Sequence, residues 1–137
     1  MKERKAILST LWIFLTANFI YCDILDNMQQ GIVKDLLAGY FGAIPITQGF
    51  LLGVSILLEI PISMILLSRI LKYKINRIAN IAAGFIMTAA QVISLVLPGG
   101  TPPIHYIFYS VIEIACAVFI MWYAWKWTET INMGETK

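Results

Sequence analysis

The chain has 137 residues, of which 59% are hydrophobic and only 13% are charged. A soluble domain of this size would carry about 25% charged residues, and the mean hydropathy of +0.78 is correspondingly high. The net charge of +2 is too small to indicate nucleic-acid binding, and the sequence has no basic patch with interleaved aromatic residues. These features exclude an ordinary soluble or nucleic-acid-binding protein and predict one membrane-embedded domain over residues 1–137.

Four apolar segments are long enough to cross a bilayer, which takes about 20 helical residues. The first covers residues 6–25, the second about 47–71, the third 78–97 and the fourth about 104–125. The connection between the second and third segments, "KYKINR", is short and basic. The connection between the third and fourth segments, "PGGTPP", cannot continue a helix. Because short connections make successive helices antiparallel neighbours, the sequence predicts an all-α, polytopic bundle of four antiparallel transmembrane helices.

The connection 26–46 between the first two segments is the longest. Its apolar residues recur at helical spacing, and they are Val33, Leu36, Leu37, Tyr40 and Phe41. Lys34 and Asp35 lie on another face, which is typical of a short amphipathic helix at a membrane interface. Such a helix could cover the outer mouth of the bundle. A solvated loop with some apolar anchors fits the same residues, and both interpretations stay open here.

Positive charges predict the orientation of the chain. With four crossings, both termini and the 72–77 connection share one side of the membrane. This side holds nine of the ten Lys and Arg residues, namely Lys2, Arg4, Lys5, Arg69, Lys72, Lys74, Arg77, Lys126 and Lys137. Only Lys34 lies opposite, so the positive-inside rule predicts a plasma-membrane protein with both termini in the cytoplasm. Trp122, Trp125 and Trp127 would then form an aromatic belt at the cytoplasmic interface.

Each predicted span carries one stripe of polar side chains. The stripe of the second span is centred on Glu59, with a serine one turn away on each side. The stripes of the first, third and fourth spans include Asn18, Gln91 and Glu113. At 1.5 Å rise per residue, these four side chains lie ~18–20 Å from the assumed cytoplasmic helix ends. We therefore expect the stripes to face inward and the four residues to form one polar layer.

The two glutamates make this layer a candidate substrate or proton site. A carboxylate at the centre of a bilayer costs ~2.5–3.5 kcal/mol on insertion scales. Two neighbouring carboxylates cannot both be ionised at low cost, so we expect at least one of Glu59 and Glu113 to hold a proton. The amides of Asn18 and Gln91 could accept hydrogen bonds from it. Alternatively, polar side chains such as Gln91, Thr88 and Ser55 serve only as interhelical glue, which contributes ~0.6 kcal/mol on average in one membrane bundle.

Proline at position 61 adds an acceptor close to Glu59. Pro61 has no backbone N–H, so the carbonyl of Leu57 loses its usual helical partner.

A second group of polar residues lies at the predicted outer ends of the first and fourth spans and could form an outer vestibule: Asp23, Asp26, His105, Tyr106 and Tyr109.

The sequence predicts neither a metal site nor a cofactor. A single histidine provides no convincing metal-ligand set, and no phosphate loop or nucleophile elbow occurs. Cys22 and Cys116 differ in predicted depth by ~10 Å, which is too far for a disulfide. We expect free thiols, with Cys22 more accessible from outside, and no enzymatic activity is predicted.

Two stretches carry a resemblance to a known family: "LSTLWIFLTANFIYCDIL" and "LLEIPISMILLSRILKYKINRIANI". They resemble an uncharacterised domain family of small prokaryotic four-helix membrane proteins. The likeness spans nearly the whole chain and includes Asn18, Tyr21, Asp23, Glu59, Pro61, Arg69, Asn76, Arg77 and Asn80. The layout is also similar, in topology alone, to DoxX-like membrane proteins. The first resemblance implies fold and location, because the family carries no assigned activity.

Two functional classes remain. In the first, the chain binds or transports a small solute, proton or cation at a buried carboxylate layer, and a homodimer would provide alternating access. In the second, the chain is a non-catalytic accessory or interaction subunit of a larger membrane complex. Its polar layer would then fix the geometry of the bundle, while the outer connection meets a partner. The lipid bilayer is the expected environment in both classes.

Overall fold

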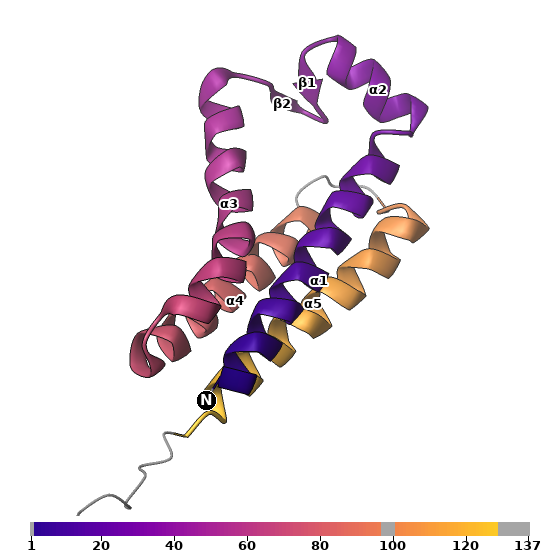
Figure 1. Cartoon of the computed structure of the whole chain (residues 1–137). Helices are drawn as coiled ribbons and strands as arrows, with labels where there is room; N and C mark the ends of the chain where they lie inside the picture. Colours follow the sequence, from indigo (N-terminus) through magenta and orange to yellow (C-terminus); the bar gives the residue numbers. More distant parts are fainter. Residues whose placement is uncertain (1, 97–100, 129–137) are drawn as a thin grey trace, which may run out of the picture.

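The computed structural model describes residues 2–96 and 101–128. Along these residues the elements are α1 (Lys2–Asp26), α2 (Gln30–Leu37), β1 (Tyr40–Phe41), β2 (Ile44–Pro45), α3 (Gln48–Ile70), α4 (Tyr73–Val96) and α5 (Ile104–Trp125). Helices α1, α3, α4 and α5 are each long and apolar enough to cross a membrane, and they pack as a bundle (Figure 1). The predicted all-α fold with four such helices is confirmed.

One helix boundary differs clearly from the prediction. Helix α4 begins at Tyr73 instead of at residue 78, so only Leu71 and Lys72 connect it to α3. The side-chain amide of Asn76 donates to the backbone carbonyls of Ser68, at 2.7 Å, and Leu71, at 3.4 Å. This contact ties the first turn of α4 to the last turn of α3, so most of "KYKINR" is helical. The predicted helix end at Leu97 and the first half of "PGGTPP" lie outside the described residues.

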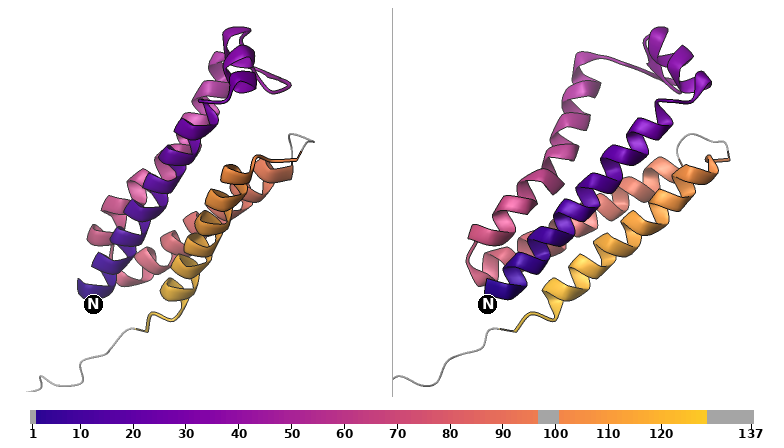
Figure 2. Two further views of the ribbon diagram at one scale, coloured as in Figure 1. Left: turned by 90° about the vertical axis from the view of Figure 1, so that its right-hand side faces the viewer. Right: turned by 45° about the vertical axis from the view of Figure 1, so that its right-hand side comes forward.

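The four long helices form two layers that separate toward one end. Helix α1 packs against α3 and α5, and α4 packs against the same two helices. Figure 2 shows the α1–α3 pair and the α4–α5 pair meeting near the N-terminus and diverging toward α2. We call the first end the basic end, since it carries the start of α1, the α3–α4 connection and the end of α5. We call the other end the α2 end.

The fully buried residues of helix α3 all lie in its second half. Its buried residues are Pro61, Met64 and Ser68, and the helix changes direction along its length (Figure 1). A proline inside a helix removes one backbone hydrogen bond and favours such a bend. The half of α3 nearer to α2 consequently leans away from α4, and none of its side chains is buried.

Helices α4 and α5 approach closely at Gly84. A β-carbon at this position would lie 2.6 Å from the Cγ atom of Met121 and 3.3 Å from the carbonyl oxygen of Ala117. A larger residue there would have to displace the side chain of Met121 and press on the backbone of α5. The remaining core consists of apolar side chains from all four long helices, including Leu8, Trp12, Leu15, Met64, Met87, Ile120 and Ala124.

Two of the three tryptophans predicted for an aromatic belt lie on the surface of the bundle. Trp122 and Trp125 are 53% and 65% exposed at the end of α5, as residues of an interfacial belt would be. Trp127 is only 1% exposed, so its assignment to the belt is wrong. Its ring meets the edge of Tyr73 at a centroid distance of 5.3 Å, and the Tyr73 hydroxyl donates to its carbonyl at 2.6 Å. Trp127 therefore closes the basic end of the core.

An amphipathic helix is present between the first two spans as α2, in place of a solvated loop, but it ends at Leu37, and Tyr40 and Phe41 of the predicted pattern lie in β1. It is followed by a hairpin in which Tyr40 pairs with Pro45 and Phe41 with Ile44. Gly39 and Gly42, at φ of 82° and 58°, provide the backbone conformations for this hairpin. No residue of α2 or of the hairpin is buried, and both project beyond the bundle (Figure 1). The sequence did not predict the hairpin, because two-residue strands show no periodicity.

Candidate functional site

Glu113 is the buried carboxyl at the centre of the candidate site. It lies on α5 three residues from Ser110, which contacts α4, and three residues from Cys116, which contacts α1. Its side chain therefore points between these two neighbouring helices, into the bundle. Glu113 is 1% exposed, and neither carboxyl oxygen has a hydrogen-bond partner among the described residues.

Such a carboxyl destabilises the bundle. A buried polar group without a partner costs roughly 1–3 kcal/mol, and more when it is charged. An apolar side chain of similar size would remove this cost, and an ion without a counter-charge is the least favourable state of all. A proton, a cation or a hydrogen-bond donor that reached Glu113 would offset the cost. Carboxyl groups of this kind within membrane-spanning helices are functional candidates.

Further ionisable groups lie between Glu113 and the α2 end. Asp23 and Cys22 of α1 are within Coulombic range of the Glu113 carboxyl. At the end of the bundle, the Nε2 atom of His105 on α5 lies 3.0 Å from a carboxyl oxygen of Asp26 on α1. From His105 to Glu113 is eight residues, or about 12 Å along α5. Ionisable side chains of α1 and α5 therefore occur from the α2 end of the bundle to the depth of the buried carboxyl.

The predicted outer vestibule is placed at this same end. Asp23 is exposed, whereas Asp26, His105, Tyr106 and Tyr109 are half-buried. Asp26 pairs with His105. Tyr106 instead faces α4, where its hydroxyl donates to the Ser94 hydroxyl at 2.7 Å. The vestibule residues are thus shared between the α1–α5 and α4–α5 contacts.

Gln91 belongs to a connected group of polar side chains between α4 and α5. Its amide donates to the Ser110 hydroxyl at 2.8 Å, and the Ser94 hydroxyl donates to the backbone carbonyl of Gln91 at 2.8 Å. With the bond from Tyr106 to Ser94, these contacts link the two helices near Glu113. This is the arrangement expected of interhelical glue.

Asn18 does not reach the other predicted site residues. Its side chain is half-buried, and its amide donates to the backbone carbonyl of Phe14 in the same helix, at 2.8 Å. Among the described residues, no hydrogen bond joins Asn18, Glu59, Gln91 and Glu113 to one another. The structure places Gln91 and Glu113 on facing helices, but it does not connect the four residues into one layer.

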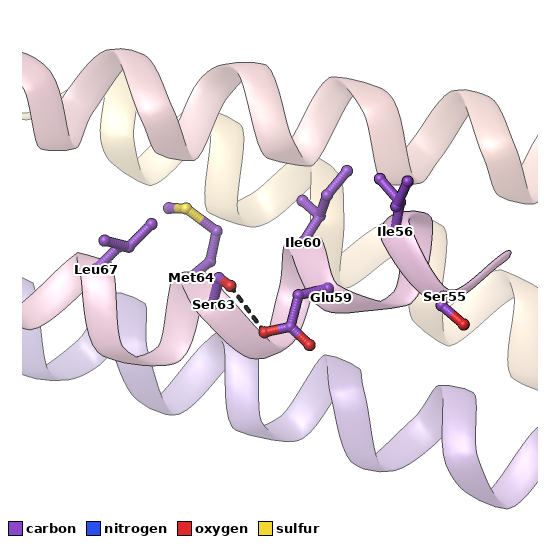
Figure 3. A pocket seen from close by; sticks show the side chains of 7 residues that line it. All are labelled: Ser55, Ile56, Glu59, Ile60, Ser63, Met64 and Leu67. Carbon is purple, nitrogen blue, oxygen red and sulfur yellow. Dashed lines mark hydrogen bonds between the residues drawn. The ribbon is translucent and has the colours of Figure 1, made fainter. Parts of the chain in front are cut away.

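Glu59 lies on the outer side of α3. It is exposed, and the Ser63 hydroxyl donates to its carboxyl at 3.0 Å (Figure 3). Both residues line a groove of about 500 Å³ that extends along α3 from Ser55 to Leu67. Pro61 and Ser68 lie on the face opposite Glu59, which packs against the rest of the bundle, and the buried side chain of Met64 borders the groove. The prediction that the polar stripe of this span faces inward is therefore wrong for the single chain.

A buried polar cluster in the basic half was largely missed by sequence reasoning. The side-chain oxygen of Asn80 accepts hydrogen bonds from Trp12 and Ser68, and the Asn80 amide donates to the side-chain oxygen of Asn76. All four side chains are fully buried. The sequence analysis places Asn76 in the predicted 72–77 connection, so a helical spacing of one turn between Asn76 and Asn80 does not follow from it. The cluster joins α1, α3 and α4, and it is hydrogen-bonded throughout.

The cysteines are free and buried. Cys22 is 2% exposed and Cys116 is 8% exposed, and neither forms a disulfide. The prediction of separate thiols is confirmed, whereas the greater accessibility expected of Cys22 is wrong, because α1 turns it toward the bundle. Within residues 2–96 and 101–128, no three or more His, Cys, Asp and Glu side chains gather closely enough to hold a metal ion.

Comparison with known proteins identifies the chain at the level of a family. No curated protein and no solved structure matches it, and none of the comparisons supports the resemblance to DoxX-like proteins. A sequence profile of a family of unknown function, DUF6326, matches residues 1–133. This match covers nearly the whole chain and agrees with the resemblance to an uncharacterised family. The chain therefore belongs to the DUF6326 family.

Proposed function

We propose that this protein is a membrane-embedded binding or transport protein for protons or small cations, with Glu113 as the binding group. The observation that carries the proposal is the burial of both Glu113 oxygens without a hydrogen-bond partner among the described residues. A purely structural role would be better served by an amide or an apolar side chain. A group that must exchange its proton or bind a cation benefits from being left without a permanent partner.

The proposed route to Glu113 runs along the contact between α1 and α5. The Asp26–His105 pair would receive the proton or cation at the α2 end, and Asp23, three residues before Asp26 on α1, would be the next carboxyl toward Glu113. Because the two helical layers diverge toward the α2 end (Figure 2), a small further separation would give water access to the carboxyl. The closed basic half would block passage in this state, so release on that side requires a second conformation.

We further propose the plasma membrane as the location, with the basic end in the cytoplasm. The start of α1, the α3–α4 connection and the end of α5 lie at one end of the bundle (Figure 1), and the cations in these segments support this orientation. The α2 end, with Lys34, would face outward. The acidic and histidine residues of the vestibule would then meet the external medium.

The proposal is tested with purified protein in liposomes that contain a pH-sensitive dye. A potassium gradient with an ionophore drives proton entry, and separate vesicles test sodium and potassium uptake. We expect flux with the wild type and its loss in Glu113→Gln, which keeps the size of the side chain. Glu59→Gln is the matched control and should retain most of the flux, because Glu59 lies on the outer face of α3. Absence of wild-type flux of protons, sodium and potassium would overturn the transport role, and equal flux in Glu113→Gln would overturn the assignment of Glu113.

A second candidate function is favoured by the exposure of Glu59. A carboxyl on the outer face of a membrane-spanning helix would meet lipid, which costs ~2.5–3.5 kcal/mol at the bilayer centre. We propose that, in this case, the chain is a subunit of a complex in which a second copy covers this face. Two-fold-related copies would present the same Glu59 and Ser63 groups to each other.

Cross-linking in native membranes tests this alternative. Ser55→Cys lies in the α3 groove, and Gly53→Cys lies at a similar depth but outside the groove residues. The background would carry Cys22→Ala and Cys116→Ala. A cross-linked dimer through position 55, but not through position 53, supports the second copy. A monomer by mass in mild detergent, together with no cross-link at position 55, would exclude it.

A further inference from the structure

A groove at the basic end combines positive charge, aromatic rings and an apolar floor. It has a volume of about 430 Å³ and is lined by Tyr73, Lys74, Arg77, Ile78 and Ile81 of α4 and by Trp125 of α5. The side chains of Ile78 and Trp125 are 67% and 65% exposed. The groove therefore opens on the outer face of two helices that are able to span a membrane.

The cationic part of the groove is held in place by stacking. The guanidinium carbon of Arg77 lies 5.5 Å from the centre of the Trp125 ring, within the range of a cation–π contact. A guanidinium stacked on a ring keeps its N–H groups free at the edge of the plane, where they can bind a phosphate oxygen pair. Lys74 is exposed beside it, and none of the six lining residues is acidic.

The apolar part continues from the charges toward the middle of the bundle. Ile78 and Ile81 follow Arg77 along α4, and Lys74 and Ile81 are seven residues, or about 10 Å, apart along the helix axis. A ligand that fills the groove must therefore be anionic at one end and apolar over the following distance. Basic grooves at the membrane boundary with such an apolar continuation suit the headgroup and upper acyl chain of a lipid.

We propose that this groove binds an anionic phospholipid. The phosphate contacts Arg77 and Lys74, and the first part of one acyl chain lies along Ile78 and Ile81, with Trp125 at the level of the headgroup. A soluble phosphate would use only the cationic rim and leave the isoleucines exposed. The proposal is independent of the role of Glu113, because no residue of the groove belongs to the carboxyl site.

The test uses the full chain, purified in a neutral detergent and stripped of lipid. Its unfolding temperature is measured with added phosphatidylglycerol, with phosphatidylcholine of the same acyl chains, with chain-free glycerophosphoglycerol and with inorganic phosphate. We expect stabilisation by phosphatidylglycerol at concentrations at least about tenfold lower than for phosphatidylcholine, given two cationic contacts. The two chain-free anions should have little effect. Equal stabilisation by inorganic phosphate would overturn the lipid assignment.

Paired variants show whether the groove itself carries the preference. Lys74→Gln with Arg77→Gln should abolish the preference for phosphatidylglycerol. Lys2→Gln with Lys72→Gln removes the same charge from exposed positions at the same end and should retain it. Equal losses in both pairs would show that only diffuse charge matters, and this would overturn the proposal. If the double variant does not fold, Lys74→Gln alone provides the test, because it leaves the Arg77–Trp125 contact intact. An unchanged preference of Lys74→Gln for phosphatidylglycerol would then count against the groove.

Discussion

Trp12 on α1 donates its indole N–H to the side-chain oxygen of Asn80 on α4 over 2.7 Å, and both side chains are fully buried. The same oxygen accepts a hydrogen bond from Ser68 of α3 at 3.2 Å. One amide therefore connects three helices in the basic half of the bundle. The Asn80–Trp12 contact also spans the two layers, which separate only beyond it toward the α2 end (Figure 2).

Replacement of Asn80 by leucine should destabilise the bundle strongly. Asn80→Leu leaves Trp12, Ser68 and Asn76 without their partner, and each buried polar group left unpaired costs roughly 1–3 kcal/mol. The measurement is the free energy of unfolding in detergent. Asn18→Leu is the matched control, since Asn18 bonds only within its own helix, and it should cost less than about 1 kcal/mol. Equal losses in the two variants would show that the cluster does not hold the helices together.

Replacement of Glu113 should have the opposite effect on stability. Glu113→Gln and Glu113→Leu break no hydrogen bond among the described residues, and they remove a desolvated acid, so the unfolding free energy should stay equal or increase. Gln91→Leu is the comparison, because it breaks the bond to Ser110 and should cost about 1 kcal/mol. A loss above about 2 kcal/mol in Glu113→Leu would mean that the carboxyl has a structural partner in the folded protein.

An added methyl group at Gly84 should push α4 and α5 apart. The new β-carbon would meet Met121 and the carbonyl of Ala117, and overpacking of this kind typically costs about 1–3 kcal/mol. Gly53→Ala is the control, because nothing lies within 4 Å of its position, and it should be neutral. Combining Gly84→Ala with Met121→Ala should recover part of the loss. Thermal unfolding of the four proteins decides the matter, and an unaffected Gly84→Ala variant would contradict the close approach.

Both thiols should react slowly in the folded protein. Cys22 and Cys116 are buried, so a maleimide reagent should label them only after unfolding in strong detergent. Mass spectrometry of the intact and digested protein follows the labelling. A Cys22–Cys116 disulfide, or rapid labelling of Cys22 in the folded state, would contradict the placement of α1 against α5.

Reporter fusions should show the proposed orientation in cells. A reporter that is active only in the cytoplasm should be active when it is fused after Lys137 or inserted between residues 71 and 72. A reporter that is active only outside the cell should be active when it is inserted within residues 101–103. The reason is the accumulation of cations at the basic end. Activity of the external reporter at the C-terminus would reverse the orientation and place the vestibule inside the cell.

The sequence by itself determined the four helices that are long and apolar enough to span a membrane, whereas it left a helix in the first connection as one of two interpretations. Length, apolar composition and periodicity are local properties, and they do not depend on how the helices pack. The start of α4 could not be found in this way. Its first turn is helical because Asn76 bonds to Ser68, a contact between two elements that exists only in the folded chain.

The tertiary structure decided which of the two glutamates, Glu59 of α3 or Glu113 of α5, lies inside the bundle. Glu59 and Glu113 each have polar or small neighbours at helical spacing, so their sequence surroundings do not tell them apart. The two glutamates are distinguished by the rotation of each helix about its own axis. Helix α3 turns Pro61, Met64 and Ser68 toward the core and Glu59 away from it, whereas α5 turns Glu113 inward. That rotation depends on how much apolar and polar surface all four helices bury together. The stripe of polar residues on one helix does not carry this information.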